Sequence, residues 1–279
     1  MKKVLFLSIV LICAYSCSIS ITRGTREVTS TSPVVMQHSF ACQFSYNDSL
    51  WFESFAQKSV EEKQQALEEV TDICMFQHIA YFENDPSVRM KALSRLSSQT
   101  ALQHVAYNDT DTEIRKYAAQ KLSSQTALQH IAFNEKDTEI RKYAVSRLSS
   151  QTALQQVAFN DPDTEIRNYA VHRLSSQTAL QHIAFNEKDT EIRKYAVSRL
   201  SSQTALQHVA FNDTDSEIRK YAVHRLSSQT ALQHIAFNEK DTEIRKYAVS
   251  RLSSLTALRQ IVATEENPEI RNLAIKMLQ

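Results

Sequence analysis

The stretch LSSQTALQHIAFNEKDTEIRKYAVSRL occupies residues 122–148, and the same letters return at residues 174–200 and 226–252. Leucines recur every 26 residues from Leu96 to Leu278, and Val70 extends the series toward the N-terminus. The chain therefore carries eight tandem units of 26 residues between about residues 70 and 279, and one such unit decides the fold. A second period overlies the first, because loops reading N-D-x-D alternate with loops reading N-E-K-D.

Apolar residues within one unit follow the spacing of two amphipathic helices. The first helix shows the i, i+3, i+4 pattern at Leu128, Ile131 and Ala132, and the second continues it at Ile140, Tyr143, Ala144 and Leu148. The chain contains one glycine and four prolines, whereas sheets and hairpins need many glycine-containing turns. We therefore expect an all-α chain.

Polar residues at the right places mark where these helices begin and end. Ser123 or Ser124 can cap the first helix by accepting a hydrogen bond from a free amide, and Asp137 can cap the second. Pro86 and Pro268 follow the capping position in the outermost units, where proline is tolerated as the first helical residue. Asn134 is expected to end the first helix in a left-handed conformation in place of glycine.

Two helices of this length cannot bury their apolar faces alone, so successive units must stack. The sequence predicts an all-α fold: an α-solenoid of about eight 26-residue two-helix repeats with N- and C-terminal caps. Residues 38–69 are expected to form the N-terminal helical cap, opened in part by the capping box Ser59-x-x-Glu62, and residues 70–279 the repeats. Ala263 and Leu273 replace the aromatic residues of earlier units, as a C-terminal cap would.

The second helix also carries a family resemblance. Asp85-Pro86-Ser87-Val88-Arg89 with Ala92 and Leu96, and later D-T-E-I-R-K-Y-A-x-x-x-L, resemble the signature of short HEAT-like repeats, the lyase-type HEAT repeat and the leucine-rich repeat variant. Ser-Ser-Gln stands where the latter has a proline-rich helix start. The resemblance implies that the repeated arginine bonds an acidic residue or a carbonyl of an adjacent unit, as a structural ladder. Its members are Arg89, Arg115, Arg141, Arg167, Arg193, Arg219, Arg245 and Arg271.

The outward face of the second helix is the candidate partner-binding face. Glu139 precedes Lys142 by three residues, so pairing along the helix is expected to neutralise part of the charge. A solvated face without a partner is the alternative. The candidate residues are Lys116, Lys142, Lys194, Lys220, Lys246, His172 and His224.

A row of histidines on the first helices does not predict a metal site. Successive members lie about 10 Å apart if the units stack, whereas the ligands of one zinc ion all lie about 2 Å from it. We expect partly exposed side chains flanking the core, with an acid-sensing row as the alternative. The row is His78, His104, His130, His182, His208 and His234, completed by Gln156 and Gln260. No metal and no cofactor is predicted.

The N-terminus reads as an export signal. Residues 1–16 carry two lysines and then a short apolar run, too short to cross a membrane, and Ala14-Tyr15-Ser16-Cys17 resembles a bacterial lipobox. A Cys17 lipid anchor, secretion with cleavage after Ser16, and a retained apolar segment are the three alternatives. Residues 17–37 would be a Ser/Thr-rich tether. Cys42 and Cys74 could pair in an exported protein, or remain separate buried thiols.

The copying itself bears on function. A catalytic centre needs a locally unique group of residues, and the units from 96 to 251 are nearly interchangeable. We therefore expect a non-enzymatic scaffold that is exported, attached to a membrane through its lipid, and bound to protein partners along its repeated face. One alternative is a cofactor-handling or accessory lyase-like protein with its site in residues 38–95. A nucleic-acid binder is the other; 32 Lys and Arg against 31 Asp and Glu oppose it.

Overall fold

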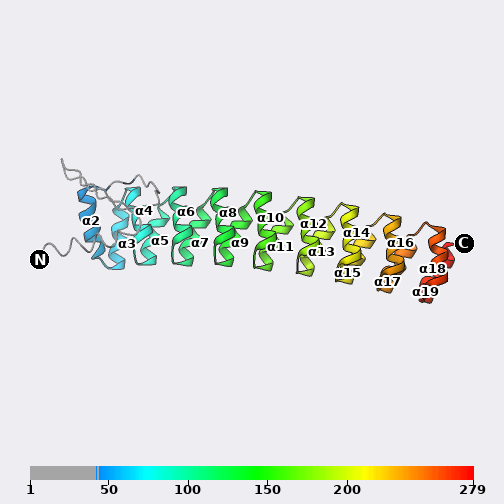
Figure 1. Ribbon diagram of the computed structural model, residues 1–279. Coiled ribbons are helices and arrows are strands. Elements are labelled where there is room, and N and C mark those ends of the chain that lie inside the picture. Colours follow the sequence, from blue (N-terminus) through cyan, green and yellow to red (C-terminus); the bar gives the residue numbers. More distant parts are fainter. Residues whose placement is uncertain (1–41, 43) are drawn as a thin grey trace, which may run out of the picture. The chain divides into compact units, whose positions relative to one another are not determined.

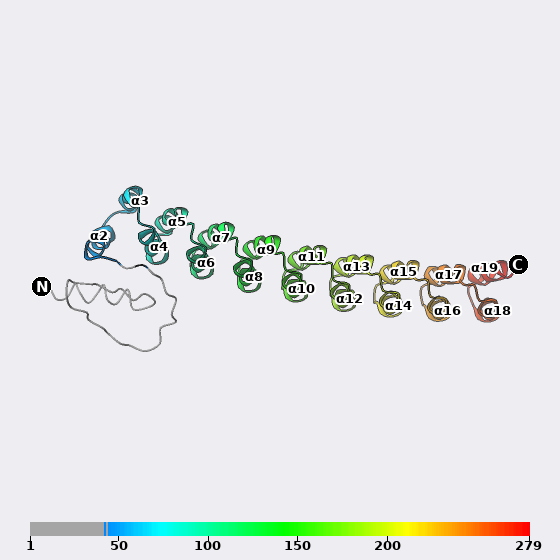
Figure 2. The ribbon, with the colours of Figure 1, turned by 90° about the horizontal axis from the view of Figure 1, so that it is seen from above.

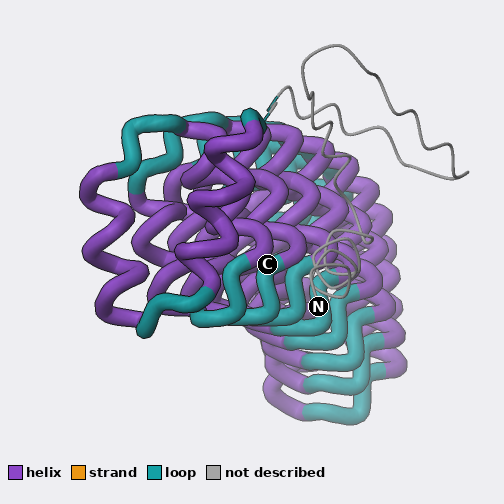
Figure 3. Tube along the Cα trace, turned by 90° about the vertical axis from the view of Figure 1, so that its left-hand side faces the viewer, coloured by secondary structure: helices purple, strands orange, loops and turns teal. Residues whose placement is uncertain are grey.

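The computed structural model describes residue 42 and residues 44–279, and the regular structure of that part of the chain is entirely helical (Figure 1, Figure 3). It divides into two compact units, one ending at Lys121 and one spanning Leu122–Gln279. Each unit is a succession of helix pairs, which confirms the predicted all-α solenoid. The expected signal peptide, Cys17 and the tether lie outside the described residues.

The helices of the two units have the following bounds. The first unit contains α2 (Tyr46–Ala56), α3 (Val60–Glu69), α4 (Ile73–Phe82), α5 (Pro86–Ser94), α6 (Gln99–Asn108) and α7 (Thr112–Lys121). The second contains α8 (Gln125–Asn134), α9 (Thr138–Arg147), α10 (Gln151–Asn160), α11 (Thr164–His172), α12 (Gln177–Asn186), α13 (Thr190–Arg199), α14 (Gln203–Asn212), α15 (Ser216–His224), α16 (Gln229–Asn238), α17 (Thr242–Ser250), α18 (Leu255–Thr264) and α19 (Pro268–Met277). Within these described residues every helix is too short or too polar to span a bilayer.

The helices of the second unit lie in two layers, with the even-numbered first helices in one and the odd-numbered second helices in the other (Figure 2). The core lies between the layers, where one repeat buries Leu128, Ile131, Ile140 and Leu148 to 1% exposure or less. These are the residues that the helical spacing selects. The same repeat also buries the small side chains of Ala127, Ala132 and Ala144.

The predicted caps of the helix starts are confirmed, and the predicted helix end is wrong. Ser124 Oγ accepts from the amide of Ala127 at 3.3 Å, and Asp137 accepts from the amide of Ile140 at 3.0 Å. Asn134 does not adopt a left-handed conformation: the chain leaves the helix through Glu135 with φ −69° and ψ 137°. The extended exit turns the Glu135 carboxylate back to accept from the amide of Asp137 at 3.0 Å.

The N-terminal segment follows the register of the repeats. Lys63 of α3 stands 26 residues before Arg89, and its ammonium bonds Glu83 at 3.0 Å across a separation of 20 residues, which is the separation that the arginine rows use. Ser59 and Glu62 form the predicted capping box, and Leu67 is buried. The helix α3 therefore acts as the second helix of a divergent unit that covers α5.

A disulfide and a cluster of aromatic rings join α2 and the residues before it to α4. The disulfide joins Cys42 to Cys74 of α4, the arrangement that the sequence left open beside two separate thiols. The His78 ring lies 4.6 Å from Phe52, 4.9 Å from Phe82 and 5.4 Å from Phe44, measured between ring centroids. Burial among these rings lowers the pKa of His78 to about 4, because the charged imidazolium is poorly solvated there.

The buried imidazole predicts an acid-sensitive N-terminal segment. The stabilising effect of neutral His78 is complete above its ordinary pKa of 6.5 and is lost as the pH falls toward 4. Between about pH 7.5 and 5 this should remove about 2 kcal/mol of unfolding free energy. The variant His78→Gln has the residue that a later repeat carries at the equivalent position, Gln156. In this variant the loss of unfolding free energy between pH 7.5 and 5 should disappear. Fluorescence of Trp51, the only tryptophan, measures unfolding here; an equal pH dependence in both proteins would contradict the assignment.

Candidate functional site

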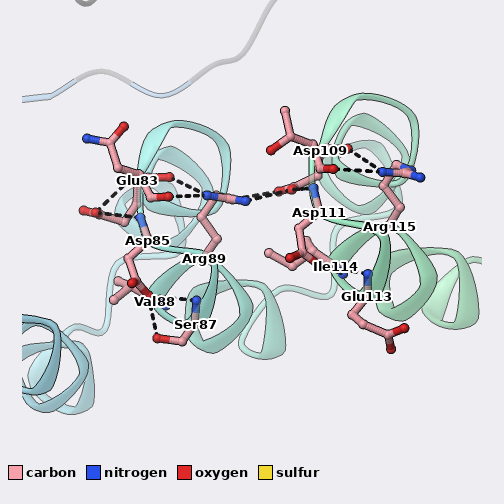
Figure 4. A network of polar contacts seen from close by, with 12 residues as sticks. Glu83, Asp85, Ser87, Val88, Arg89, Asp109, Asp111, Glu113, Ile114 and Arg115 are labelled. Atoms are coloured by element: carbon pink, nitrogen blue, oxygen red, sulfur yellow. Dashed lines mark hydrogen bonds and ion pairs between the residues drawn. The ribbon is translucent and has the colours of Figure 1, made fainter.

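An arginine in the second helix of most repeats bridges its own loop and the following repeat. In the first unit, Arg89 Nη1 donates to the carbonyls of Glu83 and Asn84 at 2.9 and 2.8 Å. Its Nε and Nη2 donate to the two carboxylate oxygens of Asp109 at 2.8 and 2.9 Å (Figure 4). The planar fork is thus bound on both sides, which a lysine could not reproduce.

The same contact recurs through the second unit. Each arginine pairs with a carboxylate 20 residues ahead at N–O distances of 2.9–3.4 Å: Arg141 with Asp161, Arg167 with Glu187, Arg193 with Asp213, Arg219 with Glu239, and Arg245 with Glu265. Arg115 and Arg271 donate to carbonyls of their own loops, at Asp109 and Glu265. The partner carboxylates are 3–11% exposed at their side chains.

The position of the acidic partner was not predicted. It is the first acidic residue of the loop, the variable letter that distinguishes N-D-x-D from N-E-K-D, and it also accepts from the amide of the next capping residue, as Glu239 does from Asp241 at 3.0 Å. The resemblance implied an acidic residue or a carbonyl of an adjacent unit. The acidic residue does belong to the following repeat, whereas the carbonyls belong to the arginine's own. An acid recurring at 26-residue intervals is the signal that could have identified it.

The Arg219–Glu239 ion pair holds its charges at neutral pH. Burial alone would raise the pKa of Glu239. The hydrogen bonds from Arg219 and from the Asp241 amide together outweigh burial, so that the pKa lies below its ordinary value of 4.5. The pairing with Glu239 in turn raises the pKa of Arg219. These groups satisfy one another and therefore form the internal framework that positions the outer surface.

A second row of contacts, also not predicted, comes from the glutamine that opens each first helix. Gln125 Nε2 donates to the carbonyl of Arg147 at 3.0 Å, and its Oε1 accepts from the amide and hydroxyl of Ser149 at 2.9 and 3.0 Å. Gln151, Gln177, Gln203 and Gln229 make the same clasp with residues 22 and 24 positions later. The Ser-Ser-Gln sequence thus ties each inter-helix loop to the next.

The residues that end the second helix alternate between two arrangements. Where the sequence reads H-R-L, the arginine reaches back one repeat: Arg173 donates to the carbonyls of Val145, Ser146 and Leu148 at 2.6–3.0 Å. Where it reads S-R-L in the second unit, the arginine stays on its own helix, and Arg199 Nη1 donates to the Tyr195 hydroxyl at 2.8 Å. Arg225 repeats the first arrangement; Arg147 and Arg251 repeat the second.

The candidate lysines lie on the second helices, half-buried or exposed. The predicted pairing of Lys142 with Glu139 along one helix is wrong, because the Lys142 ammonium bonds Glu165 of the following repeat at 3.0 Å. Lys246 likewise bonds Glu269 at 2.8 Å. Lys194 is exposed, whereas Lys116 and Lys220 are half-buried. Two of the five candidate lysines therefore share their charge with a glutamate of the following repeat.

The two histidine rows pack on aromatic rings of adjacent repeats. On the first helices, His182 lies 4.2 Å from Phe159 and His208 lies 4.0 Å from Phe185 between ring centroids. On the second helices, exposed His172 stacks on Tyr195 at 3.7 Å, and exposed His224 stacks on Tyr247 at 3.8 Å. Within residues 42 and 44–279 there is no group of three or more side chains placed to hold a metal ion.

A hollow of about 700 Å³ opens between the loops of two repeats in the second unit. Phe159, Pro162 and His182 line it together with the bonded pair Arg167 and Glu187. Its strongest polar groups are thus already engaged with each other. The residues of 38–95 on which an enzymatic site was considered have packing contacts instead: Cys42 is in the disulfide, and Trp51 stacks on Phe55 at 4.6 Å.

Comparison with known proteins places the repeats in a described family of sequences. The family model described as a BspA type leucine rich repeat region (six copies) matches residues 90–178 and 150–276. No curated protein matches the chain. Among solved structures, the X-ray structure of the Escherichia coli YibA protein is 15% identical over 80% of this chain and 97% of its own, with a TM-score of 0.35. A designed armadillo repeat protein is 18% identical over 81% of this chain and 96% of its own, with a TM-score of 0.17.

The arginine ladder predicts a large cost for losing one member. Arg219→Met should lower the unfolding free energy by about 3 kcal/mol, because the Glu239 carboxylate is left buried without its counter-charge. The loss should be partly restored in Arg219→Met with Glu239→Gln, since a neutral amide can still accept from the Asp241 amide. Chemical denaturation followed by circular dichroism measures both.

Lys142→Met is the matched control, because it removes an equal charge from an exposed pair on the same layer of helices. That variant should leave the unfolding free energy nearly unchanged. If Arg219→Met and Lys142→Met had the same effect, the ladder would not be the framework of the stack.

Proposed function

Because the chain belongs to the family of BspA type leucine rich repeat regions, whose model spans residues 90–178 and 150–276, we propose that it is a non-enzymatic scaffold that binds proteins along its second helices. Leucine-rich repeats of 20–29 residues usually place one strand in each repeat, whereas each described 26-residue repeat here holds two helices. We propose that the repeats are of the HEAT-like type, which the two helices of each described repeat support.

The observation that carries this proposal is the identity of the repeats. The same exposed side chains return at fixed intervals on the second helices, while the buried polar groups between repeats are bonded to one another. A surface of this kind offers many equal contacts, and several weak contacts made together give a high combined affinity. A partner with its own regular spacing, or with several equivalent segments, would use it best.

We further propose that the protein is exported and held at a membrane by a lipid on Cys17. The support is the sequence of residues 1–17, with two lysines, an apolar run and the lipobox-like Ala14-Tyr15-Ser16-Cys17. The disulfide between Cys42 and Cys74 also fits an oxidising compartment. An anchored scaffold would present its repeats to partners outside the cytoplasm.

Charge reversal on the proposed face tests the scaffold function. Lys142→Glu, Lys194→Glu and Lys246→Glu together should reduce the partner recovered from host membranes by about tenfold, because contacts of similar strength are lost in three repeats. Quantitative mass spectrometry of material captured by the mature protein measures the loss.

A matched control reverses Lys136, Lys188 and Lys240, which are exposed loop residues of the same three repeats. The control should retain the partner, since the net charge changes equally but on another edge. Recovery that is unchanged by the first set, or lowered equally by both, would exclude the second-helix face.

The lipid anchor has a separate test. Cys17→Ala should abolish incorporation of labelled fatty acid and release the protein from membranes, because no thiol remains at the lipobox position. Cys13→Ala, in the same segment, should leave labelling intact. Labelling that persists in Cys17→Ala would refute the anchor without affecting the scaffold proposal.

A further inference from the structure

Acidic residues are confined to one part of each repeat of the second unit. They lie in the loop between the two helices and in the first turn of the second helix, at Glu135, Asp137 and Glu139 in the repeat that begins at Leu122. No aspartate or glutamate occurs in residues 140–160, 166–186, 192–212, 218–238 or 244–264. The second helices of the second unit therefore end in segments that contain arginine, tyrosine and histidine and no acidic residue.

Two of these helix ends form the same three-residue arrangement. His172 stacks on Tyr195 of the next repeat with 3.7 Å between centroids and 26° between planes, and the Tyr195 hydroxyl accepts from Arg199 Nη1 at 2.8 Å. His224, Tyr247 and Arg251 repeat the arrangement at 3.8 Å, 18° and 2.7 Å. We call each of these a triad. Since the triads lie 52 residues apart, they occur on alternate repeats.

The contacts within a triad hold the guanidinium in place. The Tyr195 hydroxyl donates to the His172 carbonyl at 3.5 Å while it accepts from Arg199, and the Arg199 guanidinium carbon lies 5.8 Å from the centre of the same ring. His172 Nδ1 lies 2.9 Å from the carbonyl of Asn168; a carbonyl only accepts, so Nδ1 is the protonated nitrogen. The tyrosine ring is thus fixed on one face by histidine, and the arginine is fixed by the tyrosine.

Most of the guanidinium is left for a ligand. Arg199 and Arg251 are exposed, and in the described part of the chain only one nitrogen of each, Nη1, is hydrogen-bonded. The remaining N–H groups form a planar fork, the geometry that binds a carboxylate through two parallel hydrogen bonds. Holding the arginine beforehand lowers the entropy lost on binding. In the ladder, by contrast, Arg193 already binds Asp213.

We propose that the two triads bind carboxylate side chains of an extended acidic segment of the protein partner, an inference that rests on the scaffold function proposed above. Neighbouring second helices pack about 10 Å apart, so triads on alternate repeats lie about 20 Å apart. An extended chain rises about 3.4 Å per residue. The segment therefore carries two acidic residues about six positions apart.

A continuous polyanion fits this surface less well. Nucleic acid carries one phosphate for every few ångströms of backbone, whereas the triads offer one open guanidinium for every two repeats. Lys246, on the same helix as Tyr247, already bonds Glu269 at 2.8 Å. Sparse, well-spaced forks favour a ligand whose charges are equally sparse.

Synthetic peptides test the spacing. Unstructured 14-residue peptides with two glutamates six positions apart should bind the full chain about tenfold more tightly than peptides with the glutamates three positions apart, because only the former reach both triads. A peptide with two glutamines should not bind. Isothermal titration measures affinity, and the Nε–Hε NMR signals of Arg199 and Arg251 should shift on binding.

Matched variants test the residues. Arg199→Gln with Arg251→Gln should lower the affinity for the six-spaced peptide about tenfold. Lys188→Gln with Lys240→Gln removes the same charge from exposed loop positions of the same repeats and should change little. His172→Ser with His224→Ser, which installs the residue found at Ser146 and Ser198, should give a smaller loss with unchanged helicity, because only the fixing of the tyrosine is removed.

Each other outcome overturns the proposal. Equal binding by both glutamate spacings, equal losses in the arginine and lysine variants, or tighter binding of a single-stranded oligonucleotide than of the peptide through Arg199 and Arg251 would each do so. If the partner captured from membranes is retained by Arg199→Gln with Arg251→Gln, the triad proposal fails and the scaffold stands. If the wild-type protein captures no partner at all, the scaffold itself fails.

Discussion

A buried ion pair between successive repeats is the constraint on which this structure depends. An arginine and a carboxylate are each costly to remove from water alone, and the cost is offset only when the geometry is good and the remaining hydrogen-bonding groups are also satisfied. Arg219 and Glu239 meet both conditions, since the arginine also binds carbonyls of its own loop and the glutamate also binds the amide of the next helix cap. A repeat is therefore complete only beside a neighbour.

This mutual dependence also decides which surfaces are open. The loop edge is occupied by the ladder, and the other connection is occupied by the glutamine clasps, as at Gln177 and Ser201. Neither set of contacts uses the outer side of the second helices, where lysines, tyrosines and histidines recur. The internal framework and the proposed binding face thus consist of different residue positions of the same repeat. Substitutions at the face positions therefore leave the contacts between repeats intact.

Much of the fold could be predicted because contacts within a repeat follow from helical periodicity. The core residues, the Ser124 and Asp137 caps and the 26-residue unit all depend on spacing along one short segment. Contacts between repeats depend instead on the offset between neighbouring helices, which periodicity does not define. For this reason the position of the acidic partner and the glutamine clasp were not predicted, and Lys142 bonds a different glutamate from the one expected. The error at Asn134 lies within one repeat, because the Glu135 carboxylate turns back to the Asp137 amide.

The sequence shows that histidine at positions 172 and 224 alternates with serine in the neighbouring repeats, but it does not show what the histidines contact. Histidine and serine are both common on exposed helices, and only the position of Tyr195 in the following repeat shows that the histidine ring has an aromatic partner. The candidate site could therefore be located to a face from the sequence, while the two positions on that face that differ chemically from the rest required the structure.

The short reach of the bonds between repeats has a genetic consequence. The ladder spans 20 residues, the clasps 22 and 24, and the longest of the arginine contacts 28, so each bond is made to the neighbouring repeat or the loop beside it. Recombination between the identical segments 122–148, 174–200 and 226–252 would add or remove 52 residues in frame while recreating every one of these bonds. The length of the array, and with it the number of triads, can thus vary between alleles without any new interface having to evolve.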